Sequence, residues 1–342
     1  MRFLMGLSLA SYCSLAACTS ANSNEGESSA AEGETGATQS GGETGGSEDG
    51  GSGDSGETGD EGGGPAVECG ALEEGANTLT VDGETRQIIL NLPTGVDSEG
   101  PWPVVFNWHG LGDSAANMSG LVASRVDGPA YRFIAVTPED TNFQLEVPLL
   151  GVVEMDWDVF AVDADNRELA LFDAVVACLD ERYGVDADRV HTMGFSLGGI
   201  MSDLVASSRS EVIASVATYS GGYWNNPNSE LGLVNTVVDW PAYEGTATYP
   251  QLFLHGGETD TFSLGPAAIQ FNDYALADSA WLAGRGHPVF ICDHGGGHTA
   301  PPAAMGPDAL LRFFADHPRG AASPYAGALP ETWPDDCAEV LP

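Results

Sequence analysis

The chain contains no lysine, and its only basic side chains are 11 arginines, set against 50 aspartates and glutamates. Over 342 residues the formal net charge is therefore −39. A surface this acidic repels the phosphates of nucleic acid and the headgroups of anionic lipid. The composition argues against nucleic-acid binding and against adsorption to an anionic membrane surface.

Aromatic and basic residues are both missing from Thr19 to about Pro65. This segment is almost entirely Gly, Ser, Glu, Thr, Asp and Ala, which offer too little apolar surface to offset the entropy lost on ordering. We interpret residues 18–66 as a disordered linker. Residues 67–342 are then one domain, long enough for a sizeable core.

The apolar run at the start of the chain, Phe3 to Ala17, follows one arginine and is too short to span a bilayer. It predicts a signal peptide over residues 1–17. Its ending, Leu15-Ala16-Ala17-Cys18, resembles the bacterial lipoprotein box, in which the cysteine is lipidated. We expect an exported lipoprotein of the outer membrane, cell surface or periplasm, held by lipid on Cys18. The alternative is an ordinary cleaved signal with a chance cysteine.

Four cysteines remain in the expected domain, an even number that permits disulfides in an oxidising compartment. They are Cys69, Cys178, Cys292 and Cys337, and they allow three connectivities. Cys69 and Cys337 lie near the domain ends, which favours that pair. Cys178 lies in a helical pattern, where it would be buried as a small apolar residue.

From Thr78 onward, strand patterns alternate with helical ones. We expect a hairpin over 78–93 that turns at Asp82-Gly83. Further strands are expected at 103–110, 131–140, 188–194, 211–221, 249–257 and 288–296, and helices at 167–184, 196–208, 266–285 and 303–317. This alternation predicts an α/β fold with a mostly parallel central sheet and helices on both faces.

Ser196 lies where an expected strand turns directly into an expected helix, with Gly194 and Gly198 on either side. A turn this tight requires glycine two residues before and two after an exposed serine, which is the nucleophile-elbow pattern. The helix N-terminus also supplies free N–H groups for a developing oxyanion. The pattern predicts that Ser196 is a nucleophile.

A serine nucleophile of this kind is followed along the chain by an acid and then by a histidine. Asp260 follows a strand end and a Gly-Gly turn, and we favour it as the acid over the neighbouring Glu258. In the loop after the last strand we favour His298 as the base, with His294 as the alternative.

Two backbone donors are expected in the oxyanion hole. One is the N–H of Leu197, after the nucleophile, and the other is the N–H of Leu111, in the loop after an earlier strand. His109 in that loop is expected to serve loop structure rather than catalysis.

No metal or other cofactor is expected. His294 and His298 have the i, i+4 spacing of a helical zinc site, but three glycines separate them and argue against a helix. The run from Asp163 lacks the glycine and the final glutamate of a calcium loop.

The stretches HGLGD, DRVHTMGFSLGG, HGGETD and GGGHTAP, in this order, resemble the secreted polyhydroxybutyrate depolymerase and feruloyl esterase-like branch of the α/β-hydrolases. The resemblance runs from about Cys69 to His317. It implies a triad of Ser196, Asp260 and His298 that hydrolyses carboxylic esters through an acyl-enzyme. We expect the protein to be a monomer.

Two departures leave the ester specificity open. The branch often has Trp where this chain has Ala300, and the insertion over 221–248 matches no motif. Trp157, Tyr223 and Trp224 are candidates to line the substrate cleft, or they pack loops. A serine peptidase of the same fold and a non-catalytic surface-binding lipoprotein are the competing functions.

Overall fold

The structure, a computed structural model, describes residues 66–147, 151–160, 166–222, 242–264, 267–299, 305 and 307–342. The expected signal peptide, Cys18 and the linker up to residue 65 lie outside these residues. So do Tyr223, Trp224, Ala300 and the first three residues of the run that begins at Asp163.

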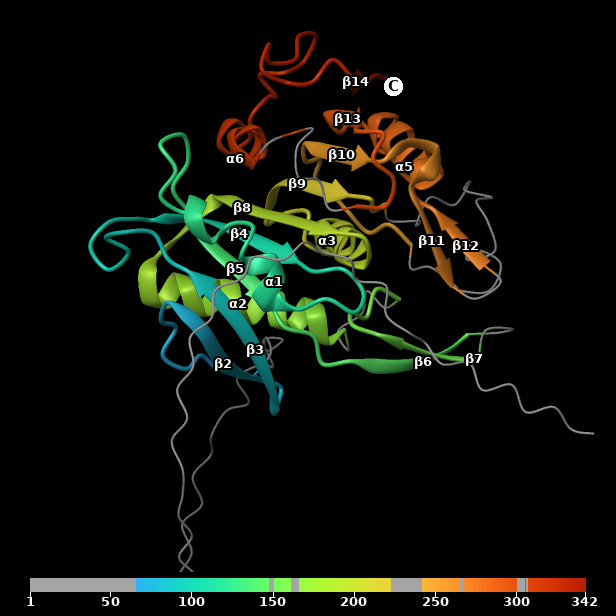
Figure 1. The fold of residues 1–342 in the computed structure, drawn as a ribbon. Coiled ribbons are helices and arrows are strands. Elements are labelled where there is room, and N and C mark those ends of the chain that lie inside the picture. The colour runs from blue at the N-terminus through green and yellow to red at the C-terminus, as the bar shows by residue number, and fades with distance from the viewer. Residues whose placement is uncertain are drawn as a thin grey trace, which may run out of the picture. The chain divides into compact units, whose positions relative to one another are not determined.

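Ten strands form the central sheet, in the order β1-β2-β3-β5-β4-β8-β9-β10-β13-β14 (Figure 1). The six strands from β5 to β13 in this order run parallel, and β1, β2, β3 and β14 are antiparallel to their neighbours. The strands are β1 Val67–Glu68, β2 Gly75–Val81, β3 Glu84–Asn91, β4 Trp102–Trp108, β5 Ile134–Pro138, β8 Val185–Phe195, β9 Ile213–Tyr219, β10 Gln251–His255, β13 Val289–Asp293 and β14 Cys337–Val340. The predicted mostly parallel sheet is confirmed.

The predicted hairpin joins β2 and β3. Val81 pairs with Glu84, and the two residues between them, Asp82 and Gly83, have φ angles of 52° and 81°. Positive φ at both central residues is typical of the tight turn that matches the twist of paired strands, and an Asp-Gly pair adopts it readily.

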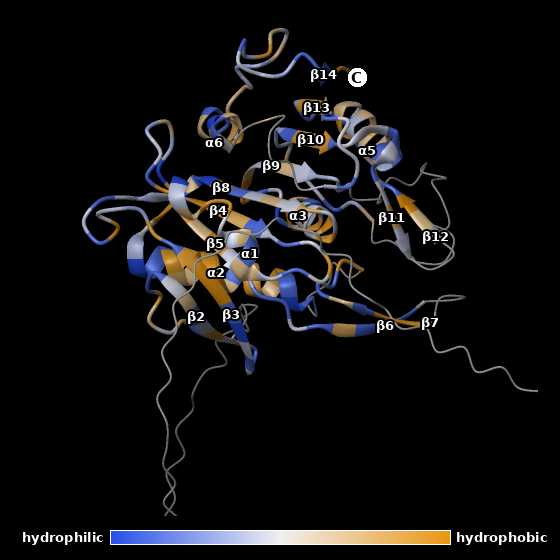
Figure 2. Ribbon diagram, in the orientation of Figure 1, coloured by the Kyte–Doolittle hydropathy of each residue, from blue (hydrophilic) through white to orange (hydrophobic). Residues whose placement is uncertain are grey.

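Alternate residues of the central strands pack into two separate cores. On β4, Val104, Phe106 and Trp108 join the core beneath α2 and α3, whereas Val105 joins the core beneath α6. Figure 2 shows apolar stretches along β4 and β5 in the middle of the sheet. Helices therefore cover both faces, as predicted, because strands buried on both sides need cover on both.

The helices are α1 Ala115–Ser119, α2 Arg167–Tyr183, α3 Leu197–Ser208, α5 Phe271–Ala283 and α6 Pro307–Asp316, with 3₁₀ turns η1 Ala123–Arg125 and η2 Gly257–Thr259. α2 begins at Asn166, whose side chain accepts hydrogen bonds from the N–H groups of Glu168 and Leu169, and ends at Gly184 with a φ of 76°. Both ends follow ordinary capping chemistry. Within the described part of the chain, no helix combines the length and apolar character needed to cross a membrane.

Several elements differ from the sequence expectations, among them the short strand β1 and the short helix α1, which were not predicted. The helix expected from residue 266 begins at Phe271, because β12 (Ala267–Gln270) pairs with β11 (Thr261–Leu264). A second hairpin, β6 (Phe143–Val147) with β7 (Gly151–Met155), was not predicted. Nor was β14, which pairs antiparallel with β13.

The favoured disulfide between Cys69 and Cys337 is wrong. The structure joins Cys69 to Cys178 and Cys292 to Cys337. Cys292 and Cys337 lie opposite each other in the register of β13 and β14. Cys178 is buried on α2, but it is bonded rather than a free thiol.

Candidate active site

Ser196 occupies the sharp turn between β8 and α3. Its φ of 54° and ψ of −122° are a strained combination for a residue with a side chain. A Cβ added at Gly198 would lie 2.1 Å from the carbonyl oxygen of Trp108, and one at Gly194 would lie 2.1 Å from that of Gly198. Both flanking positions therefore exclude any side chain, which is why glycine occupies them.

A continuous hydrogen-bond chain leads from this serine to a buried carboxylate. Ser196 Oγ lies 3.0 Å from His298 Nε2, and His298 Nδ1 lies 2.8 Å from Asp260 Oδ1. Because a carboxylate accepts hydrogen bonds, Nδ1 carries the proton and Nε2 is left to accept from the serine hydroxyl. The structure thus brings together the three residues that the sequence selected.

Neighbouring parallel strands place these residues at one edge of the sheet. Ser196, Asp260 and His298 follow β8, β10 and β13, whose carboxyl ends share that edge. Asp260 is fully buried, and its Oδ2 accepts from the N–H of Gly256 at 2.9 Å. Phe271 stacks on the His298 ring, with centroids 4.6 Å apart. Burial, the backbone N–H and the stacked ring fix the orientation of the acid and the base.

The two rival residues lie outside this chain of hydrogen bonds. Glu258 is exposed on η2. The backbone N–H of His294 donates to the His255 carbonyl, and its ring Nδ1 accepts from the N–H of Gly296. His294 therefore shapes the glycine loop, whereas His298 beyond it reaches the serine.

The loop after β4 lies directly beside the nucleophile. A Cβ at Gly110 would lie 3.4 Å from the Cβ of Ser196. The N–H groups of Leu111 and Leu197 have no acceptor among the described residues. Asp156 Oδ2 anchors the loop by accepting from the N–H of Gly112 at 2.7 Å, and burial raises the pKa of this carboxyl. Two free backbone donors thus lie near the serine, as an oxyanion hole requires.

Trp157 does not have the position of a cleft residue. Its side chain is fully buried, its indole N–H donates to the carbonyl of His109 at 2.9 Å, and its ring meets Trp108 edge-on. A ring without exposed surface supports the loop from behind, so Trp157 packs against the loop and does not line the cleft. The remaining cleft candidates, Tyr223 and Trp224, lie outside the described residues.

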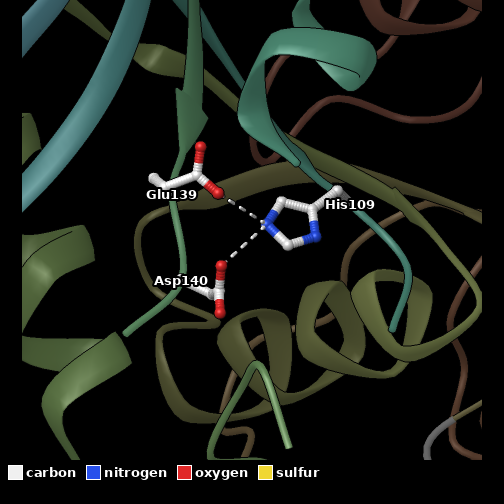
Figure 3. A group of neighbouring side chains, drawn as sticks. All are labelled: His109, Glu139 and Asp140. Atoms are coloured by element: carbon white, nitrogen blue, oxygen red, sulfur yellow. Dashed lines mark ion pairs between the residues drawn. The ribbon is translucent and has the colours of Figure 1, made fainter. Parts of the chain in front are cut away.

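Within the described ranges, one group of side chains has the spacing of metal ligands: His109, Glu139 and Asp140 (Figure 3). His109 Nε2 lies 3.7 Å from Glu139 Oε1 and 3.8 Å from Asp140 Oδ1. Burial raises the pKa of Glu139, and the neighbouring Asp140 carboxylate raises it further. The sequence did not indicate this group, because its members come from two separate loops.

Comparison with known proteins finds esterases. No known family model matches the chain. The chain is 26% identical over 248 residues to feruloyl esterase C of Emericella nidulans. The alignment covers 67% of this chain and 83% of that relative. It is 28% identical over 199 residues to feruloyl esterase B of Thermothelomyces thermophilus, covering 51% and 64%.

Solved structures match the fold over most of the domain. The crystal structure of native pOPH aligns with a TM-score of 0.59 at 18% identity, covering 79% of this chain and 95% of that one. Native sOPH aligns with a TM-score of 0.60 at 19% identity, covering 82% and 95%. The fold is that of the α/β-hydrolases.

Proposed function

We propose that the protein is a serine carboxylic-ester hydrolase with Ser196 as nucleophile, His298 as base and Asp260 as the acid that orients the base. The observation that carries this proposal is the chain of two hydrogen bonds, 3.0 Å and 2.8 Å long, from a strained serine to a fully buried carboxylate. The similarity to feruloyl esterases supports it.

The proposed reaction is acyl transfer in two halves. His298 Nε2 takes the proton of Ser196 Oγ as the oxygen attacks the ester carbonyl. The N–H groups of Leu197 and Leu111 stabilise the tetrahedral oxyanion, and the alcohol leaves with the proton from His298. Water then attacks the acyl-enzyme by the same route, and Asp260 holds the imidazole tautomer throughout.

For the substrate we propose esters of the feruloyl or acetyl type. The curated relatives named above are feruloyl esterases, which favours a hydroxycinnamoyl group. Polyhydroxyalkanoate esters are the other class implied by the sequence motifs. A feruloyl ester has a flat aromatic acyl group, whereas acetyl and polyhydroxyalkanoate esters have short aliphatic ones. The ratio of turnover on methyl ferulate to turnover on p-nitrophenyl acetate therefore distinguishes a feruloyl specificity from an aliphatic one.

We also propose that the domain is exported and tethered through lipid on Cys18. Two disulfides fit an oxidising compartment outside the cytoplasm. In a bacterial host, a Cys18→Ser variant should lose incorporation of labelled fatty acid while keeping the folded domain. Equal labelling of the variant and the parent would contradict the anchor.

The experiment that tests the enzymatic proposal compares the purified protein with its Ser196→Ala variant on p-nitrophenyl acetate and methyl ferulate. We expect turnover of both substrates by the parent and a loss in kcat on the order of 10⁴-fold or more in the variant. Circular dichroism confirms that the variant is folded. A folded parent without turnover, or a variant that retains activity, would overturn the proposal.

A further inference from the structure

The His109 ring is buried, and its Nε2 nitrogen has no hydrogen-bond partner in the part of the chain that the structure describes. The side chain is fully buried, and Nδ1 lies 3.0 Å from the carbonyl oxygen of Gly110. Because a carbonyl only accepts, Nδ1 carries a proton. The other nitrogen, Nε2, is buried without a hydrogen bond to any described residue.

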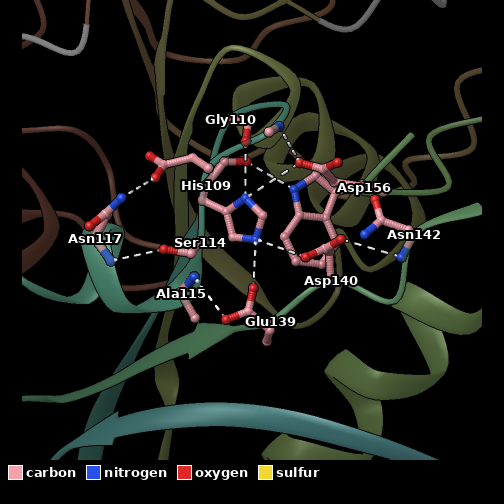
Figure 4. A network of polar contacts seen from close by, with 12 residues as sticks. His109, Gly110, Ser114, Ala115, Asn117, Glu139, Asp140, Asn142 and Asp156 are labelled. Carbon is pink, nitrogen blue, oxygen red and sulfur yellow. Dashed lines mark hydrogen bonds and ion pairs between the residues drawn. The ribbon is translucent and has the colours of Figure 1, made fainter. Parts of the chain in front are cut away.

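Two carboxylates each direct one oxygen at this nitrogen (Figure 4). Glu139 uses Oε2 to accept from the N–H of Ala115 at 3.3 Å, which leaves Oε1 to face His109. Asp140 uses Oδ2 to accept from the N–H of Asn142 at 3.3 Å, which leaves Oδ1 to face His109. The buried Nε2 therefore faces two carboxylate oxygens and makes a hydrogen bond with neither, an arrangement that a cation between the three atoms would stabilise.

The spacing fits an ion better than it fits hydrogen bonds. The separations of 3.7 Å and 3.8 Å from Nε2 are too long for hydrogen bonds. Two ligand atoms each about 2.1 Å from a tetrahedral zinc ion lie about 3.4 Å apart. The two separations from Nε2 are close to that value, and all three ligand atoms lie within 4.8 Å of one another.

We propose that His109, Glu139 and Asp140 bind a divalent metal ion of the zinc type, with water completing the coordination. One imidazole and two carboxylates make a mixed nitrogen and oxygen donor set that suits Zn²⁺. The ion joins the loop after β4 to the end of β5. These parallel neighbours pair from Val104 with Ile134 to Phe106 with Val136.

The surroundings of His109 match those of a metal-bound histidine. Such a histidine donates its other ring N–H to a carbonyl or carboxylate, which fixes the tautomer and ring orientation. Here Nδ1 faces the Gly110 carbonyl, and Asp156 Oδ2 lies 3.7 Å away. The Glu139 side chain is 32% exposed, so an ion can reach the cluster from solvent.

Such an ion would act on the loop rather than on the ester. Gly110 follows His109 directly and lies against Ser196, and the proposed donor Leu111 comes next. The ion holds the loop through His109, and the proposed nucleophile, base and acid are separate residues. Metal binding and ester hydrolysis can therefore be tested independently.

The test is calorimetric titration of the EDTA-treated, dialysed protein with zinc chloride alone, together with thermal unfolding with and without the metal. We expect one zinc ion per chain with a Kd of about 1 μM or tighter and a higher Tm in its presence. Glu139→Gln and Asp140→Asn should each weaken binding at least tenfold while leaving the metal-free protein folded. Asp113→Asn, which removes an exposed carboxylate from the same loop, is the matched control and should bind as the parent does.

Three outcomes would overturn the proposal. The first is no saturable binding at 100 μM zinc by the folded parent. The second is unchanged binding in both carboxylate variants. The third is binding that His294→Gln abolishes and Glu139→Gln preserves, which would place the ion in the glycine loop near His298. None of these readouts depends on turnover, so failure here leaves the esterase proposal standing.

Discussion

At the scale of single residues, Ser196 combines a strained backbone conformation with the position of the proposed nucleophile. Its φ of 54° costs on the order of 1–3 kcal/mol, a cost that persists only where the surrounding structure imposes it. Here the imposing contacts are the close approach of Gly194 to Gly198 and of Gly198 to Trp108. The same turn points the hydroxyl toward His298, so the strain is coupled to the position of the proposed nucleophile.

Asp260→Asn should lower kcat on methyl ferulate by about 10⁴-fold, because an amide facing His298 favours the wrong tautomer. Glu258→Gln, two residues away on the exposed turn, is the matched control and should stay within about threefold of the parent. Steady-state kinetics on the folded variants measure both. A larger loss in Glu258→Gln than in Asp260→Asn would show that the acid was wrongly assigned.

The sequence could propose the triad residues but could not exclude their neighbours. Chain order and loop position favoured Asp260 and His298, yet Glu258 and His294 satisfy the same order. Only the folded structure distinguishes them. Asp260 is buried and accepts a hydrogen bond from the N–H of Gly256, and the loop that carries His298 is held by the hydrogen bond from Gly297 to the Gly256 carbonyl. Neither contact can be seen in the local sequence. Trp157 was a cleft candidate on its residue type alone. Its local sequence does not show that its ring is fully buried.

At the scale of elements, the elbow between β8 and α3 makes a direct prediction about stability. Gly198→Ala should lower the free energy of unfolding by on the order of 3 kcal/mol, because the new methyl group would lie 2.1 Å from a backbone carbonyl. Urea denaturation followed by tryptophan fluorescence measures the difference.

Gly284→Ala is the control for this substitution. Gly284 has a φ of −62°, which any residue adopts, and a Cβ there would meet its nearest atom at 3.4 Å. The free energy of unfolding of this variant should differ from that of the parent by about 0.5 kcal/mol or less. Equal effects of the two substitutions would contradict the close packing described for the elbow.

The strands and helices that the sequence revealed are the ones with strong periodic patterns. The central strands are continuous apolar runs, and α2 has both a cap and a helical stripe. The strands that were not predicted have weaker sequence patterns. Ala267–Gln270 forms a strand because it pairs with β11. β14 is an edge strand of four residues. The disulfide was predicted wrongly because β14 was not predicted. The pairing of β14 with β13 is what places Cys337 opposite Cys292.

At the scale of the whole molecule, buried histidines link stability to pH. Burial lowers the pKa values of His287 and His317 to about 4. Both are neutral in the fold, whereas in the unfolded chain they take up protons as the pH falls through about 6.5. Their contribution to stability is therefore complete above pH 6.5 and is lost progressively from there down to about pH 4.

Between pH 7.5 and pH 5, each of these histidines should reduce the free energy of unfolding by on the order of 2 kcal/mol. His317→Gln should flatten this dependence by about the same amount, because glutamine takes up no proton in the unfolded chain. Urea unfolding at the two pH values, with the disulfides intact, gives the slope for parent and variant. An identical slope in both would contradict the assigned protonation of His317.

The central claim is that Ser196 is the nucleophile, and covalent trapping tests it most directly. The purified protein is treated with a p-nitrophenyl alkylphosphonate and digested with trypsin. Cleavage after Arg189 and Arg209 releases one peptide, Val190 to Arg209, that carries Ser196 together with three other serines. We predict a single phosphonyl adduct that tandem mass spectrometry assigns to Ser196, with loss of activity in step with labelling. An unlabelled, folded protein, or an adduct on another residue, would contradict the account.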